Sequence, residues 1–250
     1  MYEHYGMLFF CDFYSIKIHS KYSSTGLPDL GNDSFIYDIK LSADGSILFS
    51  TSDRIVRAWD LRKFQLISRL NTGHKSLVTC LAVDDDEIND TRLVITGSKD
   101  HTVKVFELEQ NLNGIYVPKY TLKPPHYDGI EALRLTDKGR YLFSGGRDGC
   151  IKKWSLTEQR CVASLGNCHR DWVLALDTFL QETVLLSACR SGYLRVWSTE
   201  NCRSFGEIQA HTRAVNDIAT IPMAIFTASS DCTINLWQYR DTSPIDDIVE

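Results

Sequence analysis

The chain has 250 residues, of which 43% are hydrophobic and 24% charged, and its formal net charge at pH 7 is −5. This composition suits a protein with a substantial core, and the negative charge argues against broad attraction of its surface to nucleic acid or anionic membrane. No apolar stretch approaches the ~20 residues of a membrane-spanning helix, and the amino terminus lacks the basic start of a signal peptide. We therefore expect a cytoplasmic protein.

Eight cysteines are spread along the chain without a Cys-x-x-Cys pair, and several lie in apolar runs such as SLVTCLAV. We interpret them as small buried hydrophobic residues in a reducing compartment, with disulfides or a zinc site as the alternative. On this interpretation no metal and no cofactor is expected.

Residues 1–34 are predicted to hold a degenerate partial repeat and a loop. The run MLFFCDFYSIKIHSKYSS has the alternation of two strands, with Ile16 and Ile18 pointing inward. No first strand precedes this run, and residues 21–34 are too polar and loop-like for a convincing fourth strand.

Five similar segments follow between residues 35 and 240. Each carries an aromatic residue near its end, and these lie 47, 48, 43 and 40 residues apart: Trp59, Phe106, Trp154, Trp197 and Trp237. An acidic residue stands six positions earlier in four segments, whereas the fourth segment has Ser191: Asp53, Asp100, Asp148 and Asp231. A histidine opens every segment after the first: His74, His126, His169 and His211.

Each segment has the same internal order. An apolar strand follows the histidine, then a strand of small residues, a tight turn and a third strand that carries the aromatic. A more variable fourth strand closes the unit, in runs such as FQLISRLN, YVPKYTL, CVASLG and SFGEIQA. Four short strands every 40–45 residues are typical of a WD-type β-propeller. We predict an all-β protein with five complete four-stranded blades at 35–240, a partial blade before them and an acidic tail at 241–250.

The recurring histidine, hydroxyl and acid could be mistaken for a hydrolytic triad. Because the set returns in blade after blade, we interpret it as structural, with buried polar groups linked to the aromatic of the same blade. The two clearest predicted sets are His126, Ser144, Asp148, Trp154 and His211, Thr227, Asp231, Trp237. No catalytic residue is assigned.

Several runs go beyond the general repeat. ITGSKDHTVKVFEL (95–108), PPHYDGIEAL (124–133), CHRDWVLAL (168–176) and LLSACRSG (185–192) occur in this order. They resemble the carboxy-terminal WD tail of the large kinesin-like proteins of the kinesin-4 family. The resemblance implies a motor and a coiled coil upstream, and a role at the microtubule cytoskeleton, with tubulin or cargo adaptors as partners. The chain shows neither a G-x-x-x-x-G-K-[ST] phosphate loop nor a long heptad run, so no motor activity is predicted for it.

The ring of blades looks incomplete, because propellers commonly close with more than five. We therefore expect this chain to be a fragment of a longer protein. Open strand edges would favour self-association.

A partner-binding face is predicted where the turn after the second strand meets the loop before the first. Three adjacent blades present a cation there, and the loops after the histidines add three cations and one exposed tryptophan: Lys99, Arg147, Arg190, Lys75, Arg170, Arg213 and Trp172. Such a face suits an acidic, flexible partner better than nucleic acid. Solvated cations balanced by Asp128 and Asp171 are the alternative.

A second row of cations lies two residues before each aromatic, and we interpret it as structural: Arg57, Lys104, Lys152 and Arg195.

Two classes of function remain. The first is a cytoskeletal interaction module, and the second is a WD adaptor of another class, such as a ubiquitin-ligase substrate receptor or a chromatin or signalling scaffold. An enzyme is poorly supported, since no nucleophile, metal set or phosphate loop stands apart from the repeat.

Overall fold

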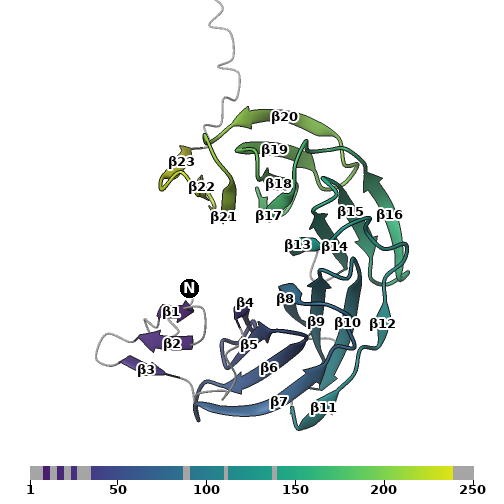
Figure 1. Ribbon diagram of the computed structural model, residues 1–250, viewed down its shortest axis with the longest axis vertical. Helices are drawn as coiled ribbons and strands as arrows, with labels where there is room; N and C mark the ends of the chain where they lie inside the picture. Colours follow the sequence, from purple (N-terminus) through teal and green to yellow (C-terminus); the bar gives the residue numbers. More distant parts are fainter. Residues whose placement is uncertain are drawn as a thin grey trace, which may run out of the picture. The chain divides into compact units, whose positions relative to one another are not determined.

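A computed structural model of the chain describes residues 35–86, 91–109, 112–136 and 140–238, together with three short strands before them (Figure 1). The described residues form strands and turns, and none of them belongs to a helix long and apolar enough to cross a membrane. The chain divides into two compact units, Met1–Val173 and Leu174–Glu250. Each unit is a series of antiparallel sheets, as the repeat predicts.

The first unit begins with three short antiparallel strands, β1 (Leu8–Cys11), β2 (Ile16–His19) and β3 (Ser24–Gly26). Strand β3 pairs with β2 inside a segment that was predicted to be a loop. The predicted inward orientation of Ile16 and Ile18, and the remainder of residues 1–34, lie outside the described residues.

Three repeat sheets follow in the first unit. The first contains β4 (Ile36–Leu41), β5 (Ile47–Ser52), β6 (Ile55–Asp60) and β7 (Gln65–Asn71). The second contains β8 (Val78–Asp86), β9 (Thr91–Ser98), β10 (Val103–Glu109) and β12 (Tyr120–Thr121). The third contains β13 (Ile130–Thr136), β14 (Tyr141–Gly146), β15 (Ile151–Ser155) and β16 (Arg160–Leu165). In each sheet the strands pair antiparallel in chain order, and in the second sheet β12 pairs directly with β10.

The predicted fourth strand YVPKYTL is instead divided between two sheets. Strand β11 (Gly114–Tyr116) pairs in parallel with β7 of the preceding sheet, and the Ser68 hydroxyl donates to the carbonyl of Gly114 at 2.7 Å. Only the short β12 pairs with β10. Pro118 lacks a backbone donor, which explains why one continuous strand does not form here. The outer edge of β7 therefore gains a partner that the repeat pattern did not predict.

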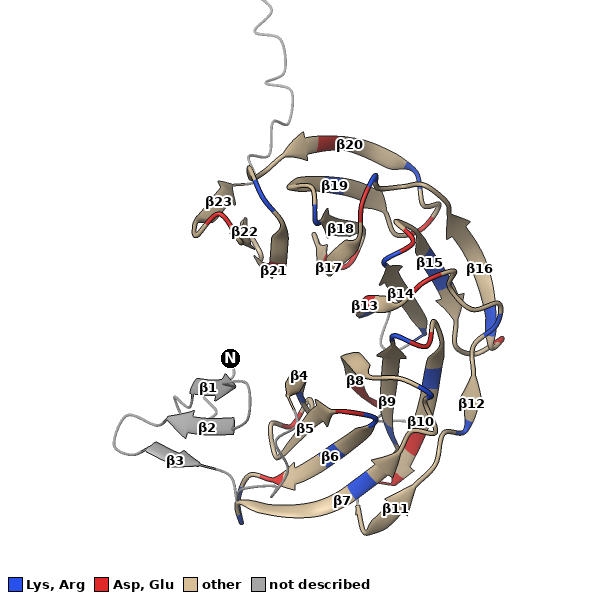
Figure 2. Cartoon of the chain, in the orientation of Figure 1, with Lys and Arg blue, Asp and Glu red and all other residues tan. Residues whose placement is uncertain are grey.

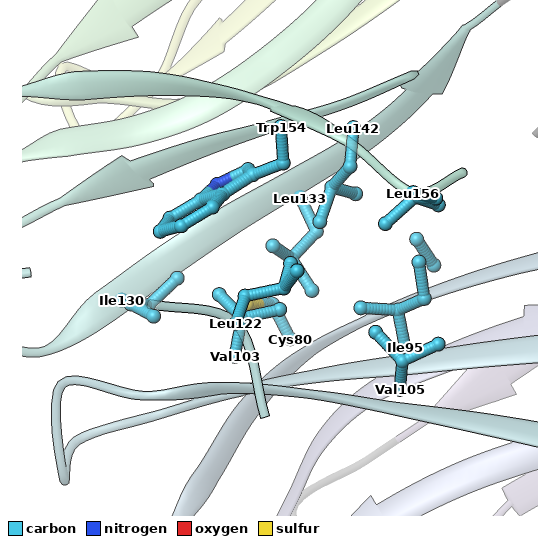
Figure 3. Packing of buried hydrophobic residues seen from close by; sticks show 11 residues of the cluster. Cys80, Ile95, Val103, Val105, Leu122, Ile130, Leu133, Leu142, Trp154 and Leu156 are labelled. Atoms are coloured by element: carbon cyan, nitrogen blue, oxygen red, sulfur yellow. The ribbon is translucent and has the colours of Figure 1, made fainter. Parts of the chain in front are cut away.

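Neighbouring sheets of the first unit pack face to face. Cys80, Ile95 and Val105 of the second sheet form one cluster with Leu142 and Trp154 of the third (Figure 3). The sheets approach closely at Gly97, where a Cβ atom would lie 2.6 Å from Cys80 Sγ and 2.8 Å from Ile130 Cγ2. Fully burying each large apolar side chain contributes about 1.5–3 kcal/mol, so these clusters are the main source of stability.

The second unit contains two sheets. The first has β17 (Val173–Phe179), β18 (Val184–Cys189), β19 (Tyr193–Ser198) and β20 (Ser204–Gln209). The second has β21 (Val215–Ile221), β22 (Ala224–Ser229) and β23 (Ile234–Gln238). Among the described residues this last sheet has three strands, whereas five complete four-stranded blades were predicted. No run like the four quoted fourth strands follows the fifth aromatic, and the predicted acidic tail at 241–250 lies outside the described residues.

Candidate partner-binding face

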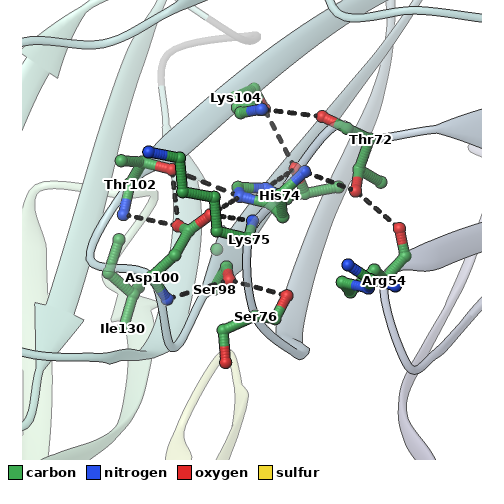
Figure 4. A network of polar contacts seen from close by, with 12 residues as sticks. Arg54, Thr72, His74, Lys75, Ser76, Ser98, Asp100, Thr102, Lys104 and Ile130 are labelled. Atoms are coloured by element: carbon green, nitrogen blue, oxygen red, sulfur yellow. Dashed lines mark hydrogen bonds and ion pairs between the residues drawn. The ribbon is translucent and has the colours of Figure 1, made fainter.

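The repeat histidines form polar networks inside single sheets. In the second sheet His74 Nδ1 lies 2.9 Å from Asp100 Oδ2, and His74 Nε2 lies 2.9 Å from Thr96 Oγ1 (Figure 4). The backbone N–H of Lys75 donates to the same carboxylate at 2.8 Å. The acid therefore ties the turn after β9 to the loop before β8.

The third sheet has the complete predicted set. His126 Nδ1 lies 2.9 Å from Asp148 Oδ2, and His126 Nε2 lies 2.7 Å from Ser144 Oγ. Trp154 Nε1 donates to the same hydroxyl at 2.8 Å. Because an ionised carboxylate only accepts, Nδ1 donates to Asp148, and Nε2 then accepts from Ser144. The hydroxyl thus accepts a hydrogen bond from the indole and donates one to the imidazole.

The second unit repeats this arrangement in its last sheet. His211 lies 3.0 Å from Asp231 and 2.8 Å from Thr227, to which Trp237 donates at 3.1 Å. In the preceding sheet Trp197 donates to Ser187 at 2.8 Å, and Ser191 occupies the acidic position beside Cys189. His169, which belongs to the first unit, is buried.

The first repeat sheet departs from the pattern. Trp59 donates to Ser50 at 2.9 Å, but Asp53 is exposed and its carboxylate faces Arg54 at 3.9 Å. No repeat histidine opens this segment, so Asp53 has no imidazole to hold.

The hydrogen bonds keep the repeat acids ionised. Burial alone would raise the pKa of Asp148, but hydrogen bonds from His126 and from the N–H groups of Tyr127 and Cys150 outweigh it and lower that pKa. The pKa of Asp100 is lowered in the same way, against burial, by His74, Thr102 and Lys75. For Asp231 the Thr233 hydroxyl is the largest cause of the lowered pKa.

Geometry explains why these sets are structural. The Ser144 hydroxyl is fully buried beneath Trp154, so a substrate carbonyl cannot reach it. A serine nucleophile must meet substrate directly, and this one is enclosed between two neighbouring side chains.

The second row of cations is also used internally. Lys104 Nζ donates to the Thr72 carbonyl at 2.9 Å, and Lys152 Nζ donates to the carbonyls of Pro124 and Pro125 at 3.1 and 2.6 Å. Arg195 binds Glu207 at 2.6 Å. Buried Arg57 bonds Ser52 through one terminal nitrogen while its Nε has no partner, and burial lowers its pKa.

The predicted face of the first unit contains two pairs of a cation and an aromatic ring. Lys99 Nζ lies 5.9 Å from the centroid of the Tyr37 ring, and the Arg147 guanidinium lies 4.1 Å from the centroid of the Trp172 ring. Gly129 separates the two cations, since its Cβ would lie 3.2 Å from Lys99 Cα and 3.5 Å from Arg147 Cδ. The structure therefore brings Lys99 and Arg147 together, each in a turn and directly before a repeat acid in the sequence. Figure 2 shows basic and acidic segments side by side in turns between the strands of the first unit.

Trp172 is half-buried, whereas the sequence was interpreted as exposing it. Arg147 covers one side of its ring and also donates to Glu131. The tryptophan therefore holds a cation in place and offers less surface to a partner than expected.

Sequence reasoning missed Tyr127, whose relative exposure of 88% is the highest among the exposed large hydrophobic residues described. Its backbone N–H donates to Asp148 at 3.0 Å, and its ring lies 5.9 Å from Lys152 Nζ. A signal was present, because Tyr127 directly follows a repeat histidine, as do Lys75 and Arg170, and all three are exposed. The residue after the histidine thus projects from this face.

The remaining predicted cations, Arg190 and Arg213, are exposed in the second unit. The turn that carries Arg190 lies against the backbone of Arg213, since a Cβ on Gly192 would lie 2.9 Å from the Arg213 carbonyl oxygen.

Comparison with known proteins identifies the repeat. The family described as "WD domain, G-beta repeat" matches residues 27–60, 64–107, 117–155, 159–198 and 202–238. Kinesin-like protein KIF21B of Mus musculus is 46% identical over 204 residues, and Kinesin-like protein KIF21A of Homo sapiens is 43% identical over 206 residues. Kinesin-like protein klp-12 of Caenorhabditis elegans is 30% identical over 203 residues. These alignments cover 78–82% of this chain but only 12% of each relative.

A solved structure supports the fold. A chain of the "Crystal Structure of Mitotic Checkpoint Complex" superimposes with a TM-score of 0.80 at 17% sequence identity, over 94% of this chain and 73% of the other. At that identity the likeness concerns the architecture alone.

Proposed function

This chain belongs to the WD domain, G-beta repeat family, and from that membership we propose that it is a non-catalytic interaction module of a kinesin-like protein that binds microtubules. The proposed ligand is an acidic, flexible segment of tubulin. The kinesin-like relatives support this assignment, because they match the chain across four-fifths of its length. A protein with this function would be located in the cytoplasm, at the cytoskeleton.

The observation that carries the proposal is the arrangement of cations in the first unit. Lys75 and Arg170 are exposed, Lys99 lies over the Tyr37 ring, and Arg147 lies over the Trp172 ring and binds Glu131. The nearby acids Asp100 and Asp148 are already occupied by the repeat histidines. Carboxylates of a partner would therefore find cations that are oriented in advance.

Tyr127 completes this face as its aromatic contact. Exposed ion pairs contribute only about 0–1 kcal/mol each, so the pairs that Lys75, Lys99 and Arg170 can form with a partner give modest affinity. An exposed tyrosine whose backbone is fixed by Asp148 adds contact area at a small cost in conformational entropy, which is typical of interface hot spots. Tyr127 takes the role that was predicted for Trp172.

Microtubule co-sedimentation tests the proposal. The variant Lys75→Glu/Lys99→Glu/Arg170→Glu, with all three changes in the first unit, is expected to weaken binding at least tenfold. The matched control Lys119→Glu/Arg160→Glu/Arg203→Glu makes the same change in net charge at other exposed positions and should bind almost as well as the parent. Circular dichroism verifies that both variants are folded.

Tyr127→Ala is expected to weaken binding severalfold, with little change in its salt dependence. If charge reversal on the face and at the control positions lowers binding equally, only net charge matters and the proposed face is wrong. If the parent chain does not co-sediment with microtubules at all, a WD adaptor of another class is the better assignment.

A further inference from the structure

Three loops of the first unit present the residue after the repeat histidine in the same way. Lys75, Tyr127 and Arg170 each stand three positions before a first strand, namely β8, β13 and β17. The backbone N–H of Lys75 donates to Asp100 at 2.8 Å, and that of Tyr127 donates to Asp148 at 3.0 Å (Figure 4). The first two loops are therefore anchored to the repeat acids of the second and third sheets.

The histidine backbone fixes the second and third of these loops to the turn of the sheet before. The N–H of His126 donates to the carbonyl of His101 at 3.0 Å, and the N–H of His169 donates to the carbonyl of Gly149 at 3.0 Å. His101 and Gly149 both directly follow a repeat acid, so the two contacts are equivalent. Each loop is thus displaced from the one before it by one sheet.

The side chains of this row project into solvent. Tyr127 is 88% exposed, and Lys75 and Arg170 are exposed as well. Within the part of the chain that the structure describes, none of these three side chains takes part in a hydrogen bond or an ion pair. The row therefore offers a cation, a phenol ring and a second cation in this order.

Two acids lie beside the row, directly after the tyrosine and the arginine in the sequence. Asp128 accepts a hydrogen bond from the backbone N–H of Gly129 at 2.6 Å, and Asp171 accepts one from the backbone N–H of Trp172 at 2.8 Å. Both carboxylates are thus bound by their own loops, which leaves the exposed cations available to the carboxylates of a partner.

The packing of the sheets sets the spacing of the row. The second and third sheets share one core cluster, and packed sheets lie ~10 Å apart. A polyproline II helix rises ~3.1 Å per residue with three residues per turn, so every third side chain lies on the same side, about 9 Å from the one before. Flexible acidic chains populate this conformation readily. A β-strand alternates its side chains and therefore does not place residues three apart on one side.

We infer that the row binds a polyproline II segment in which an apolar residue lies three positions after one acidic residue and three positions before another, an assignment that rests on the proposed function of this face. Lys75 and Arg170 bind the two carboxylates, and Tyr127 packs against the apolar side chain. The cations attract any acidic chain from a distance. The ring between them accepts the apolar side chain at one spacing, so Tyr127 determines specificity.

Fluorescence anisotropy with two labelled peptides tests the spacing. The matched peptide has glutamate at its second and eighth positions and phenylalanine at its fifth, with proline and serine elsewhere. The shifted peptide has the same composition, but its phenylalanine stands at the sixth position, one-third of a turn away from the side that carries the glutamates. The parent chain is expected to bind the matched peptide at least fivefold more tightly.

Two variants of the chain locate the apolar contact. Tyr127→Ala should bind both peptides with the same, weaker affinity, because no ring remains to distinguish them. Ile115→Ala is the matched control, since it removes a side chain that is 76% exposed elsewhere in the first unit. This control should keep the full preference for the matched peptide. Circular dichroism verifies that both variants are folded.

Equal affinity of the parent for the two peptides would overturn the inference. So would a preference that Tyr127→Ala leaves intact, or the absence of measurable binding to either peptide. Co-sedimentation of the parent with microtubules reports separately on the proposed function. A chain that keeps the peptide preference but does not co-sediment would reject tubulin as the partner, while the pattern of the ligand would stand.

Discussion

Replacing Ser144 by alanine would break two hydrogen bonds at once. The Ser144 hydroxyl is the common partner of His126 Nε2 at 2.7 Å and Trp154 Nε1 at 2.8 Å, and all three side chains are buried. Ser144→Ala leaves a donor and an acceptor without partners. Each such buried group costs about 1–3 kcal/mol, so the free energy of unfolding should fall by about 2–6 kcal/mol.

Ser50→Ala is the matched control within the same unit. Ser50 is equally buried and accepts from Trp59 Nε1 at 2.9 Å, but no histidine of the described part of the chain bonds to it. This variant removes the same atom and leaves one unpaired group, so the expected loss is about 1–3 kcal/mol, clearly less than that of Ser144→Ala.

Urea unfolding followed by tryptophan fluorescence and circular dichroism measures the difference. With a slope of about 2 kcal/mol per molar urea, 1 kcal/mol separates the two midpoints by about 0.5 M. Unchanged slopes would show that the variants alter stability and not the extent of unfolding. Equal losses for both variants would refute the argument that Ser144 connects the imidazole to the indole.

Two further expectations follow from the repeat. The pKa values of Asp100, Asp148 and Asp231 are lowered in the folded chain, so below about pH 4 the unfolded chain binds more protons than the folded chain. The free energy of unfolding should therefore be greatest near neutral pH and fall as acid is added. Asp148→Asn should flatten the pH profile of urea midpoints, and an unchanged profile would contradict this role. Gly149→Ala should lower the thermal midpoint of the protein strongly, because φ at Gly149 is +68° and the new Cβ would lie 2.6 Å from the His169 carbonyl oxygen. Gly166→Ala is the control, because no atom lies within 4 Å of its Cβ position. Equal thermal midpoints of the two variants would disprove the clash.

Much of the polar framework could be predicted from the sequence because it recurs. A buried imidazole needs partners, and in the segments of His74, His126 and His211 an acid stands four positions after the hydroxyl. The sets around His126 and His211 lie together for this reason. Polar residues that recur in successive repeats thus identify the side chains that bind one another inside one repeat.

Contacts that occur once escaped this reasoning. Strand β11 leaves its own repeat to pair with β7, and periodicity carries no information about such a unique segment. Trp172 was expected at the surface because its position in a loop is visible in the sequence, while the guanidinium that covers it comes from a different repeat. Tyr127 was overlooked because its exposure depends on how the loop after His126 is anchored.

The amino-acid sequence by itself determined the repeat, its four-strand order and the polar residues that bind one another inside a sheet. These features depend on the alternation of side chains along a strand and on the need of buried polar groups for hydrogen-bond partners, and both act over short distances along the chain. Only the tertiary structure decided which cations are held against aromatic rings and which tyrosine projects. Those properties depend on packing between residues far apart in sequence, where a neighbouring sheet either removes a side chain from water or leaves it exposed.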